Sequence, residues 1–307
     1  MPVTMKHRHL SPVAWPLAAL LLLSTGAARA QAKKDLVLAA TIFPAADIVR
    51  RIAGPDARVI QVLPPGASPH TFDLTPGQVR QLQDVRLVFK IGGIDDWIDG
   101  IAESLPGAAM IVLNRDIAMK PIHEGGHAHG GHGAGHAAEN DPHYWLDAAN
   151  GALMARTVAG ALSAYDPVNA DRYQANYQRL ARELAALHAE LRAQLSNVKN
   201  RRLIVFHDGW RYFASAYRLE IAAVFQAAPG REPTPRELQG LYAQARRFGI
   251  KTVFSEPQLP AASLQPLLHD LGLRLVVLDP LGGIAANDSY AALLRRIAQA
   301  IRRALGS

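Results

Sequence analysis

Short runs of aliphatic and β-branched residues recur along this chain, separated by stretches with helical patterning. Four runs lie in the first half and four in the second, at residues 36–40, 59–63, 87–91, 110–113, 203–206, 221–225, 252–254 and 273–278. Continuous apolar runs with helical segments between them are typical of buried parallel strands in βα units. The sequence therefore predicts an α/β fold with two parallel-type sheets, one in each half.

One long amphipathic segment separates the two sets of runs. It begins at Asp166-Pro167, which supplies an N-cap residue followed by proline at the first helical position. Apolar side chains then follow at spacings of three and four residues, at Tyr173, Tyr177, Leu180, Leu184, Leu187, Leu191 and Leu195. This stripe predicts a helix of about 28 residues, roughly 40 Å long. Between two α/β halves, such a helix is best interpreted as a rigid connector.

These patterns predict the organisation of the whole chain. We expect an N-terminal α/β lobe at residues 31–165, a connecting helix at residues 166–198 and a C-terminal α/β lobe at residues 199–307. The length of 307 residues suits this division, because domains usually contain about 100–200 residues.

The first 30 residues have the three-part pattern of a secretory signal peptide. A basic stretch at residues 6–9 precedes an apolar run at residues 13–23, and small residues in Ala28-Arg29-Ala30 predict cleavage near Ala30. The apolar run is shorter than the roughly 20 residues that a membrane-spanning helix needs. The chain has no Cys that could carry a lipid anchor, so we expect a soluble periplasmic protein.

The positive charge of the chain does not indicate a nucleic-acid partner. Removal of the signal peptide takes away Lys6, Arg8 and Arg29 and no acidic residue, so the formal net charge falls from +7 to +4. The other basic residues are scattered and form no aromatic-interleaved stripe. The absence of Cys further excludes disulfide scaffolds, Cys-based zinc fingers, iron–sulfur proteins and enzymes with a Cys nucleophile.

Residues 121–140 differ in composition from the rest of the chain. They are rich in Gly and His and have little to bury, which predicts a mobile loop. Its five histidines are His123, His127, His129, His132 and His136. A plain linker would be rich in Gly and Ser, so we interpret the loop as a weak, multi-site metal-capturing segment, with a spacer unrelated to metal as the alternative.

Polar residues follow several of the apolar runs, where ligands bind in open parallel sheets. His70 follows the second run in a Pro-rich loop, and His207, Glu256 and Asp279 each follow a run of the second half. His143 comes directly after the His-rich segment. Three imidazoles and a carboxylate oxygen suit a tetrahedral Zn²⁺ shell. Because these donors come from both halves, we expect the metal site in the cleft between the lobes.

With these motifs in this order, the sequence resembles the zinc-binding periplasmic proteins of bacterial ABC importers, the cluster A-I metal-specific solute-binding proteins. The resemblance covers essentially the whole mature chain, and its motifs lie at residues 66–73, 141–147, 205–210, 254–258 and 278–282. It implies that His70, His143 and His207 are the histidine ligands and that Asp279 is the carboxylate ligand. Glu256 is expected to lie in the cleft and to support the ligands without binding the metal directly.

The residue at position 207 favours zinc within this family. In the manganese-binding members that position is typically Glu, and a His-rich loop between the first two ligand motifs is a feature of the zinc branch. A nitrogen-rich donor set favours zinc on chemical grounds as well. A manganese-preferring member of the family is the alternative, and in some zinc members water takes the fourth position that Asp279 would fill.

The resemblance implies a binding protein and not an enzyme. It would capture Zn²⁺ in the periplasm, as a transported ligand, and deliver it to a membrane permease whose cytoplasmic ATPase drives import. We expect a monomer. A secreted zinc hydrolase is the alternative from another class, because three histidines and a water also form catalytic zinc sites. The chain has no Gly-x-Ser-x-Gly elbow and no His-Glu-x-x-His pair on a predicted helix, which disfavours that alternative.

Overall fold

The computed structural model of this chain describes residues 1–2, 36–121, 140–224, 234–258, 265–285 and 288–306. The chain divides into two units, residues 1–34 and residues 35–307, and the fold described below is that of the second unit. None of the helices in the described part of the chain combines the length and the apolar character that crossing a membrane requires.

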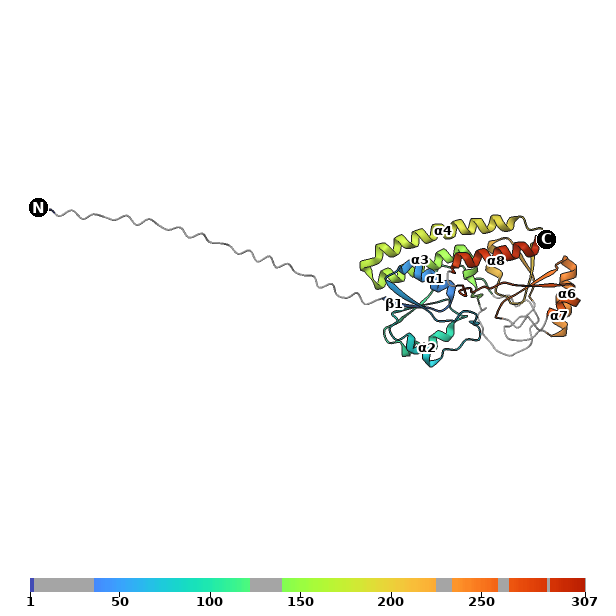
Figure 1. The fold of residues 1–307 in the computed structure, drawn as a ribbon, viewed down its shortest axis with the longest axis horizontal. Helices are drawn as coiled ribbons and strands as arrows, with labels where there is room; N and C mark the ends of the chain where they lie inside the picture. Colours follow the sequence, from blue (N-terminus) through green and yellow to red (C-terminus); the bar gives the residue numbers. More distant parts are fainter. Residues whose placement is uncertain (3–35, 122–139, 225–233, 259–264, 286–287, 307) are drawn as a thin grey trace. The chain divides into compact units, whose positions relative to one another are not determined.

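Two four-stranded parallel sheets form the cores of two lobes (Figure 1). The N-terminal sheet has the order β2-β1-β3-β4 and consists of β1 (Leu36–Ala40), β2 (Ala57–Gln61), β3 (Leu87–Lys90) and β4 (Ala109–Val112). The C-terminal sheet has the order β6-β5-β7-β8 and consists of β5 (Arg202–Val205), β6 (Glu220–Val224), β7 (Thr252–Ser255) and β8 (Arg274–Val277). The predicted α/β class with two parallel sheets is therefore confirmed.

The central strands explain why the apolar runs are continuous. All residues of β3 and β7 are buried, as are all but the first residue of β1 and β5, because helices and loops cover both faces of each sheet. The edge strands β4 and β8 are more exposed. In each sheet the next two strands of the chain lie on opposite sides of the first strand, β1 or β5. Open parallel sheets bind ligands beyond the carboxyl ends of the strands at such a reversal of strand order.

Helices surround the two sheets. In the N-terminal lobe they are α1 (Phe43–Ala53), α2 (Pro76–Gln81) and α3 (Ala148–Tyr165), with 3₁₀ helices at Asp96–Ser104 and Tyr144–Leu146. In the second half they are α5 (Arg211–Ala216), α6 (Pro235–Phe248), α7 (Gln265–Asp270) and α8 (Tyr290–Leu305). The start of α8 follows N-cap chemistry, since the Ser289 hydroxyl accepts the backbone N–H of Ala292.

The helix predicted over residues 166–198 is observed as α4 (Ala170–Ser196), which follows a 3₁₀ turn at Pro167–Asn169. The carbonyl of Asp166 accepts the backbone N–H of Asn169 at 3.2 Å, but its side chain forms no cap hydrogen bond with the backbone of this turn. Its carboxylate instead accepts the Asn169 side-chain amide at 2.7 Å and the Tyr173 hydroxyl at 2.8 Å. The predicted apolar stripe is buried, except that Tyr177 is only partly covered. The 3.6-residue period therefore located the helix correctly, whereas the first turn has 3₁₀ geometry.

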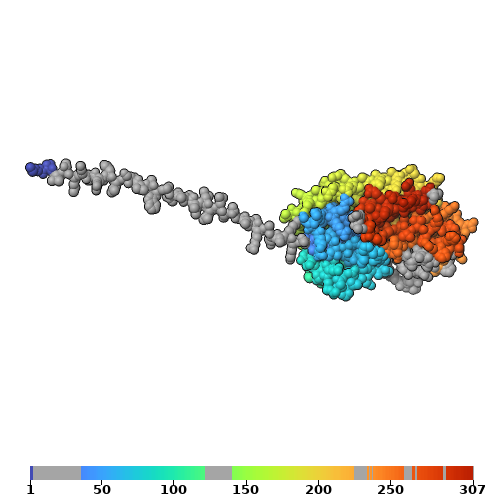
Figure 2. All heavy atoms as spheres, in the orientation of Figure 1, coloured from blue at the N-terminus to red at the C-terminus, as the bar shows by residue number. Residues whose placement is uncertain are grey.

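Helix α4 packs along both lobes instead of bridging open space. It lies against α1 and α3 of the N-terminal lobe and against α8 at the end of the chain. Helix α8 also contacts α1, and Figure 2 shows its red surface next to the yellow-green surface of α4. Leu38, Leu187 and Leu278 accordingly belong to one continuous hydrophobic cluster. The lobes thus share a core, and the predicted boundaries between the domains stay a prediction.

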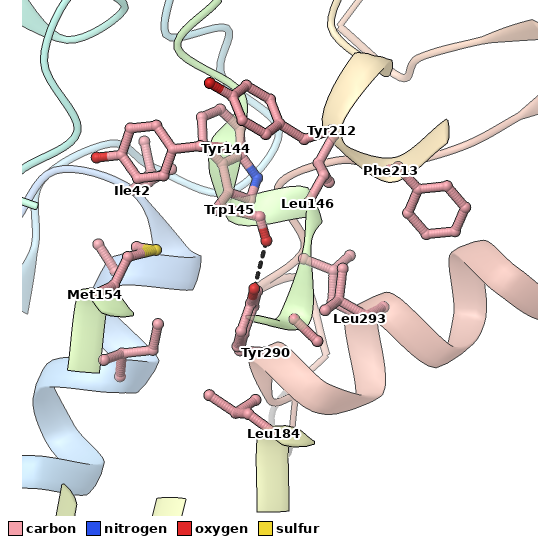
Figure 3. Packing of buried hydrophobic residues seen from close by; sticks show 14 of the residues in the cluster. Ile42, Tyr144, Trp145, Leu146, Met154, Leu184, Tyr212, Phe213, Tyr290 and Leu293 are labelled. Atoms are coloured by element: carbon pink, nitrogen blue, oxygen red, sulfur yellow. Dashed lines mark hydrogen bonds between the residues drawn. The ribbon is translucent and has the colours of Figure 1, made fainter. Parts of the chain in front are cut away.

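The segment around Tyr144 and Trp145 lies at the centre of this shared core (Figure 3). Trp145 donates its indole N–H to the carbonyl of Pro280 at 2.9 Å, and its own carbonyl accepts the hydroxyl of Tyr290. The Tyr217 hydroxyl accepts the backbone N–H of Ala148 at 3.3 Å. Buried hydrogen bonds of this kind hold the segment that carries His143 against the C-terminal half.

Candidate metal centre

Three imidazoles meet where the loops at the carboxyl ends of the strands converge. His70 comes from the loop after β2, His143 from the turn that begins the 3₁₀ helix at Tyr144–Leu146, and His207 from the second position after β5. One ligand nitrogen from each ring lies within 4.8 Å of the other two. The ring centroids are 5.4, 4.7 and 4.8 Å apart. The three histidines that the sequence predicted together are therefore together in the fold.

The loop that carries His70 is stiffened by its own sequence. Pro64, Pro65 and Pro69 restrict its backbone, and Gly66 has a φ of +82°, which favours glycine. The indole N–H of Trp97 donates to the carbonyl of Pro69 at 3.0 Å. The residue before His70 is thereby anchored, although His70 itself lies at the exposed edge of the site.

His143 and His207 are buried, being 4% and 6% exposed, and a carboxylate touches each ring. Nδ1 of His143 lies 2.8 Å from Oδ1 of Asp141, and Nδ1 of His207 lies 3.3 Å from Oε1 of Glu256. The same Glu256 oxygen accepts the indole N–H of Trp210 at 2.9 Å. Both rings therefore turn Nδ1 toward a carboxylate and leave Nε2 for the centre of the cluster.

Gly209 is a site residue that the sequence reasoning missed. A Cβ atom at this position would lie 2.9 Å from Nδ1 of His207, closer than such contacts allow, and 3.0 Å from Cδ2 of His143, which is tighter than most Cβ contacts. The absence of a side chain at Gly209 thus permits the two rings to approach each other. Its position two residues after His207 in His207-Asp208-Gly209 was the available signal, but that spacing does not reveal a contact with His143.

The surroundings of His70 favour its neutral form. Burial of the His70 ring, followed by repulsion from His207 and His143, lowers the pKa of His70 from 6.5 to about 3. Although the residue is exposed overall, its ring faces two other potential cations. A neutral ring keeps a free nitrogen lone pair, which is the form that binds Zn²⁺.

The space between the imidazoles is small. Its volume is about 10 Å³, close to the ~10–15 Å³ that one water molecule needs. Besides the three histidines, the lining includes Glu256 and Gln258 from the loop after β7, together with Ser68, Pro69, Ile94, Trp145, Pro280 and Leu281. This space suits a single ion and is far below the roughly 300–1,000 Å³ of pockets for organic ligands.

Asp279 precedes two residues that line this site, and one oxygen of its carboxylate binds the backbone. Oδ1 of Asp279 accepts the backbone N–H of Leu281 at 2.9 Å. Among the described residues, the group whose ligand atoms lie within 4.8 Å of one another contains the three histidines and does not extend to Asp279. Its neighbours Pro280 and Leu281 line the space instead. Direct ligation by Asp279 stays a prediction.

The histidines of the Gly-rich segment, His123, His127, His129, His132 and His136, lie outside the described residues. The two ends of that segment are described. Pro121 and Asn140 form an antiparallel bridge, and the next residue, Asp141, donates its backbone N–H to the carbonyl of Lys120 at 2.8 Å. The two ends of the segment therefore lie side by side, and the second end is three residues before His143.

The chain is similar to several known proteins. A family model described as zinc-uptake complex component A, periplasmic, matches residues 38–304. The high-affinity zinc uptake system protein ZnuA of Paracoccus denitrificans is 31% identical over 324 residues, which cover 95% of this chain and 99% of the relative. A crystal structure of ZnuA is 29% identical, with a TM-score of 0.78 over 88% of this chain and 99% of the other. The crystal structure of a ZnuA deletion mutant with zinc bound is 28% identical, with a TM-score of 0.76 over 89% of this chain and 98% of the other.

Proposed function

Because the chain belongs to the family of the periplasmic component A of zinc-uptake complexes, we propose that it captures Zn²⁺ through His70, His143 and His207 for import. The single observation that carries this proposal is the cluster of three ligand nitrogens within 4.8 Å of one another. Three neutral imidazoles form a zinc-binding set that needs one further ligand for a tetrahedral shell. Manganese prefers carboxylate, carbonyl and water oxygens, so this donor set favours zinc.

The metal is cargo in this proposal. The family is one of solute-binding transport proteins, and a space of about 10 Å³ admits an ion but no organic substrate. The partner that we propose is the membrane permease of a zinc ABC importer, energised by its cytoplasmic ATPase. We further propose that the protein acts as a monomer in the periplasm, after cleavage near Ala30. Mass spectrometry of the exported protein should then find an N-terminus at Gln31.

The test is a zinc titration of the mature protein against a chelating indicator. Alanine at position 70, 143 or 207 should weaken the tightest site by at least about 100-fold, because loss of a direct ligand exceeds the 10–100-fold cost of losing a supporting hydrogen bond. The matched control is His269→Ala on α7, whose side chain is 92% exposed and lies outside the cluster. Unchanged affinity in His70→Ala or His207→Ala would disprove the assignment.

The fourth ligand is tested separately. Oδ1 of Asp279 accepts the backbone N–H of Leu281, so ligation by this residue would use Oδ2, whereas Glu256 and Gln258 already line the space. Zinc titration of Asp279→Ala distinguishes direct ligation by Asp279 from a water molecule in the fourth position. Direct ligation predicts a loss as large as that of the histidine variants, and a water ligand predicts a much smaller one. X-ray absorption at the zinc edge would count the imidazole ligands in the same sample.

The His-rich loop is proposed to capture additional zinc weakly. Because Pro121 and Asn140 pair with each other, residues 123–136 can be replaced by a short Gly-Ser link without moving the ends of the segment. This deletion should remove weak zinc equivalents from the titration and leave the tight site unchanged. Loss of the tight site would contradict the division of roles between loop and cleft.

A further inference from the structure

We propose that Asp141 is a positioning residue for metal capture, which fixes the ring of His143 in the form that presents Nε2 to the ion. This inference rests on the proposed zinc site and assigns a role to a residue outside the three-histidine cluster. Asp141 is 1% exposed, and its Oδ1 lies 2.8 Å from Nδ1 of His143. The same oxygen accepts the backbone N–H of His143 at 2.9 Å.

This contact determines which nitrogen of His143 carries the proton. An ionised carboxylate has no hydrogen to donate, so Nδ1 of His143 must donate to Asp141. The neutral ring then has its lone pair on Nε2, and rotation of the ring would break the bond. A carboxylate that holds the remote N–H of a ligating histidine orients the ring and raises its basicity as a ligand.

The backbone of Asp141 is itself held in place. Its N–H donates to the carbonyl of Lys120 at 2.8 Å, and the N–H of Lys120 donates to the hydroxyl of Tyr212 on α5, also at 2.8 Å. The carboxylate that orients His143 is thereby tied to the C-terminal half, which carries His207. Asp141 therefore holds His143 relative to a ligand from the other half of the chain.

The second oxygen of Asp141 supplies an independent argument. Oδ2 is buried and has no hydrogen-bond partner, and within the described part of the chain no Lys or Arg forms an ion pair with Asp141. A buried carboxylate without a compensating cation is costly. A divalent ion on the far side of the His143 ring would supply the missing positive charge. The buried negative charge of Asp141 therefore favours a cation at His143.

Its neighbours provide the contrast that the test needs. His70 has no carboxylate on its ring in the described part of the chain, whereas His207 has Glu256. Asp208 is adjacent to the proposed ligand His207, yet its carboxylate pairs with Arg211 at 2.6 Å, whereas that of Asp141 pairs with an imidazole. Asp208→Asn is therefore a matched control for Asp141→Asn, with the same change of atoms one residue from a ligand.

The first measurement uses the unaltered mature protein without metal. Long-range ¹⁵N–¹H correlation spectra of the histidine rings should show the proton of His143 on Nδ1. A proton on Nε2 would overturn the proposal, whatever the zinc affinity. If the wild-type protein failed to bind zinc, the proposed function would fall while this spectrum still reported the tautomer, so the two failures are distinguishable.

The second measurement compares variants that circular dichroism shows to be folded. Asp141→Ala should weaken zinc binding by about 10–100-fold and give a mixture of His143 tautomers. Asp141→Asn, whose amide oxygen can still accept from Nδ1, should restore the wild-type tautomer and part of the affinity. Asp208→Asn should leave the His143 spectrum unchanged. A folded Asp141→Ala protein with wild-type affinity and tautomer would overturn the proposal.

Discussion

At the scale of single residues, contact distances decide how well the three imidazoles can share an ion. His143 and His207 approach each other over Gly209, where a Cβ atom would meet both rings at about 3 Å. Both side chains are buried, and Asp141 and Glu256 hold their rings by hydrogen bonds, so neither ring can move away from an added methyl group without breaking such a bond. The missing side chain of Gly209 is therefore part of the geometry of the site.

Substitution of Gly209 by Ala should weaken the tight zinc site by at least tenfold, because the added methyl group forces the rings off their positions. Overpacking of this kind also costs about 1–3 kcal/mol of stability. Zinc titration and thermal unfolding measure the two effects. Gly240→Ala on α6 is the control, since nothing lies within 4 Å of a Cβ atom there. It should leave zinc affinity unchanged and slightly stabilise the helix. Wild-type affinity in Gly209→Ala would contradict this account.

The lowered pKa of His70 predicts a pH dependence in the metal-free protein. The folded-state pKa is about 3 and the unfolded value is about 6.5, so above pH 6.5 the ring is neutral in both states. As the pH falls from 6.5 toward 3, the unfolded chain binds a proton that the folded chain does not, and stability falls. His70→Asn should therefore lose less stability than wild type between pH 6.5 and 4, measured by urea unfolding in the presence of a chelator. Equal losses would show that His70 titrates normally.

At the scale of elements, α4 is both connector and core. Its buried stripe contacts α1 and α3 on one side and α8 on the other, so it covers both lobes along its length. Leu187 lies in the middle of this stripe and is 1% exposed. A helix that is packed in this way cannot bend without uncovering apolar surface of both lobes.

Leu187→Ala should therefore destabilise the protein by about 2–5 kcal/mol, through lost apolar contact and the cavity left behind. Unfolding should remain a single transition, because α4 belongs to one core that includes residues of both lobes. The control is Gln178→Ala on the exposed side of the same helix, with an expected change within about 0.5 kcal/mol. Two separate transitions in chemical denaturation would show that the lobes unfold independently.

At the scale of the whole molecule, the lobes are joined by more than one connection. Trp145 bonds to Pro280, Tyr290 bonds to Trp145, and α8 returns from the end of the chain to pack on α1. A wide opening of the cleft would break these buried contacts together. Zinc binding and release should therefore proceed through small shifts of the loops that carry the ligands.

Small-angle X-ray scattering of the mature protein, with and without zinc, tests this expectation. The radius of gyration should be unchanged by the ion within the precision of the measurement. Hydrogen exchange should slow in the loops that carry His70, His143 and His207, and stay constant in α4 and α8. A clear contraction on zinc binding, with altered exchange in α4, would indicate a hinge motion instead.

Much of this architecture could be predicted from local pattern. The sequences of β1, β3, β5 and β7 are continuous apolar runs because both faces of each sheet are covered. The sequence of α4 has apolar residues with a 3.6-residue period because one side of the helix is buried. The three clustered histidines could be selected because each follows a strand or lies in a motif of the family. The first turn of the long helix could not, because Asp166 bonds to side chains of Asn169 and Tyr173 that no cap rule anticipates.

The sequence by itself determined the α/β class, the long helix and the choice of the three histidines. Periodicity and residue chemistry are local properties, so they can be recognised from the order of the residues alone. Only the tertiary structure decided the contacts between segments far apart in the chain. It set Asp141 on the ring of His143, placed Gly209 against the rings of His143 and His207, bonded Oδ1 of Asp279 to the backbone of Leu281 and packed α8 on α1. These features depend on distances between side chains, which no spacing along the chain encodes.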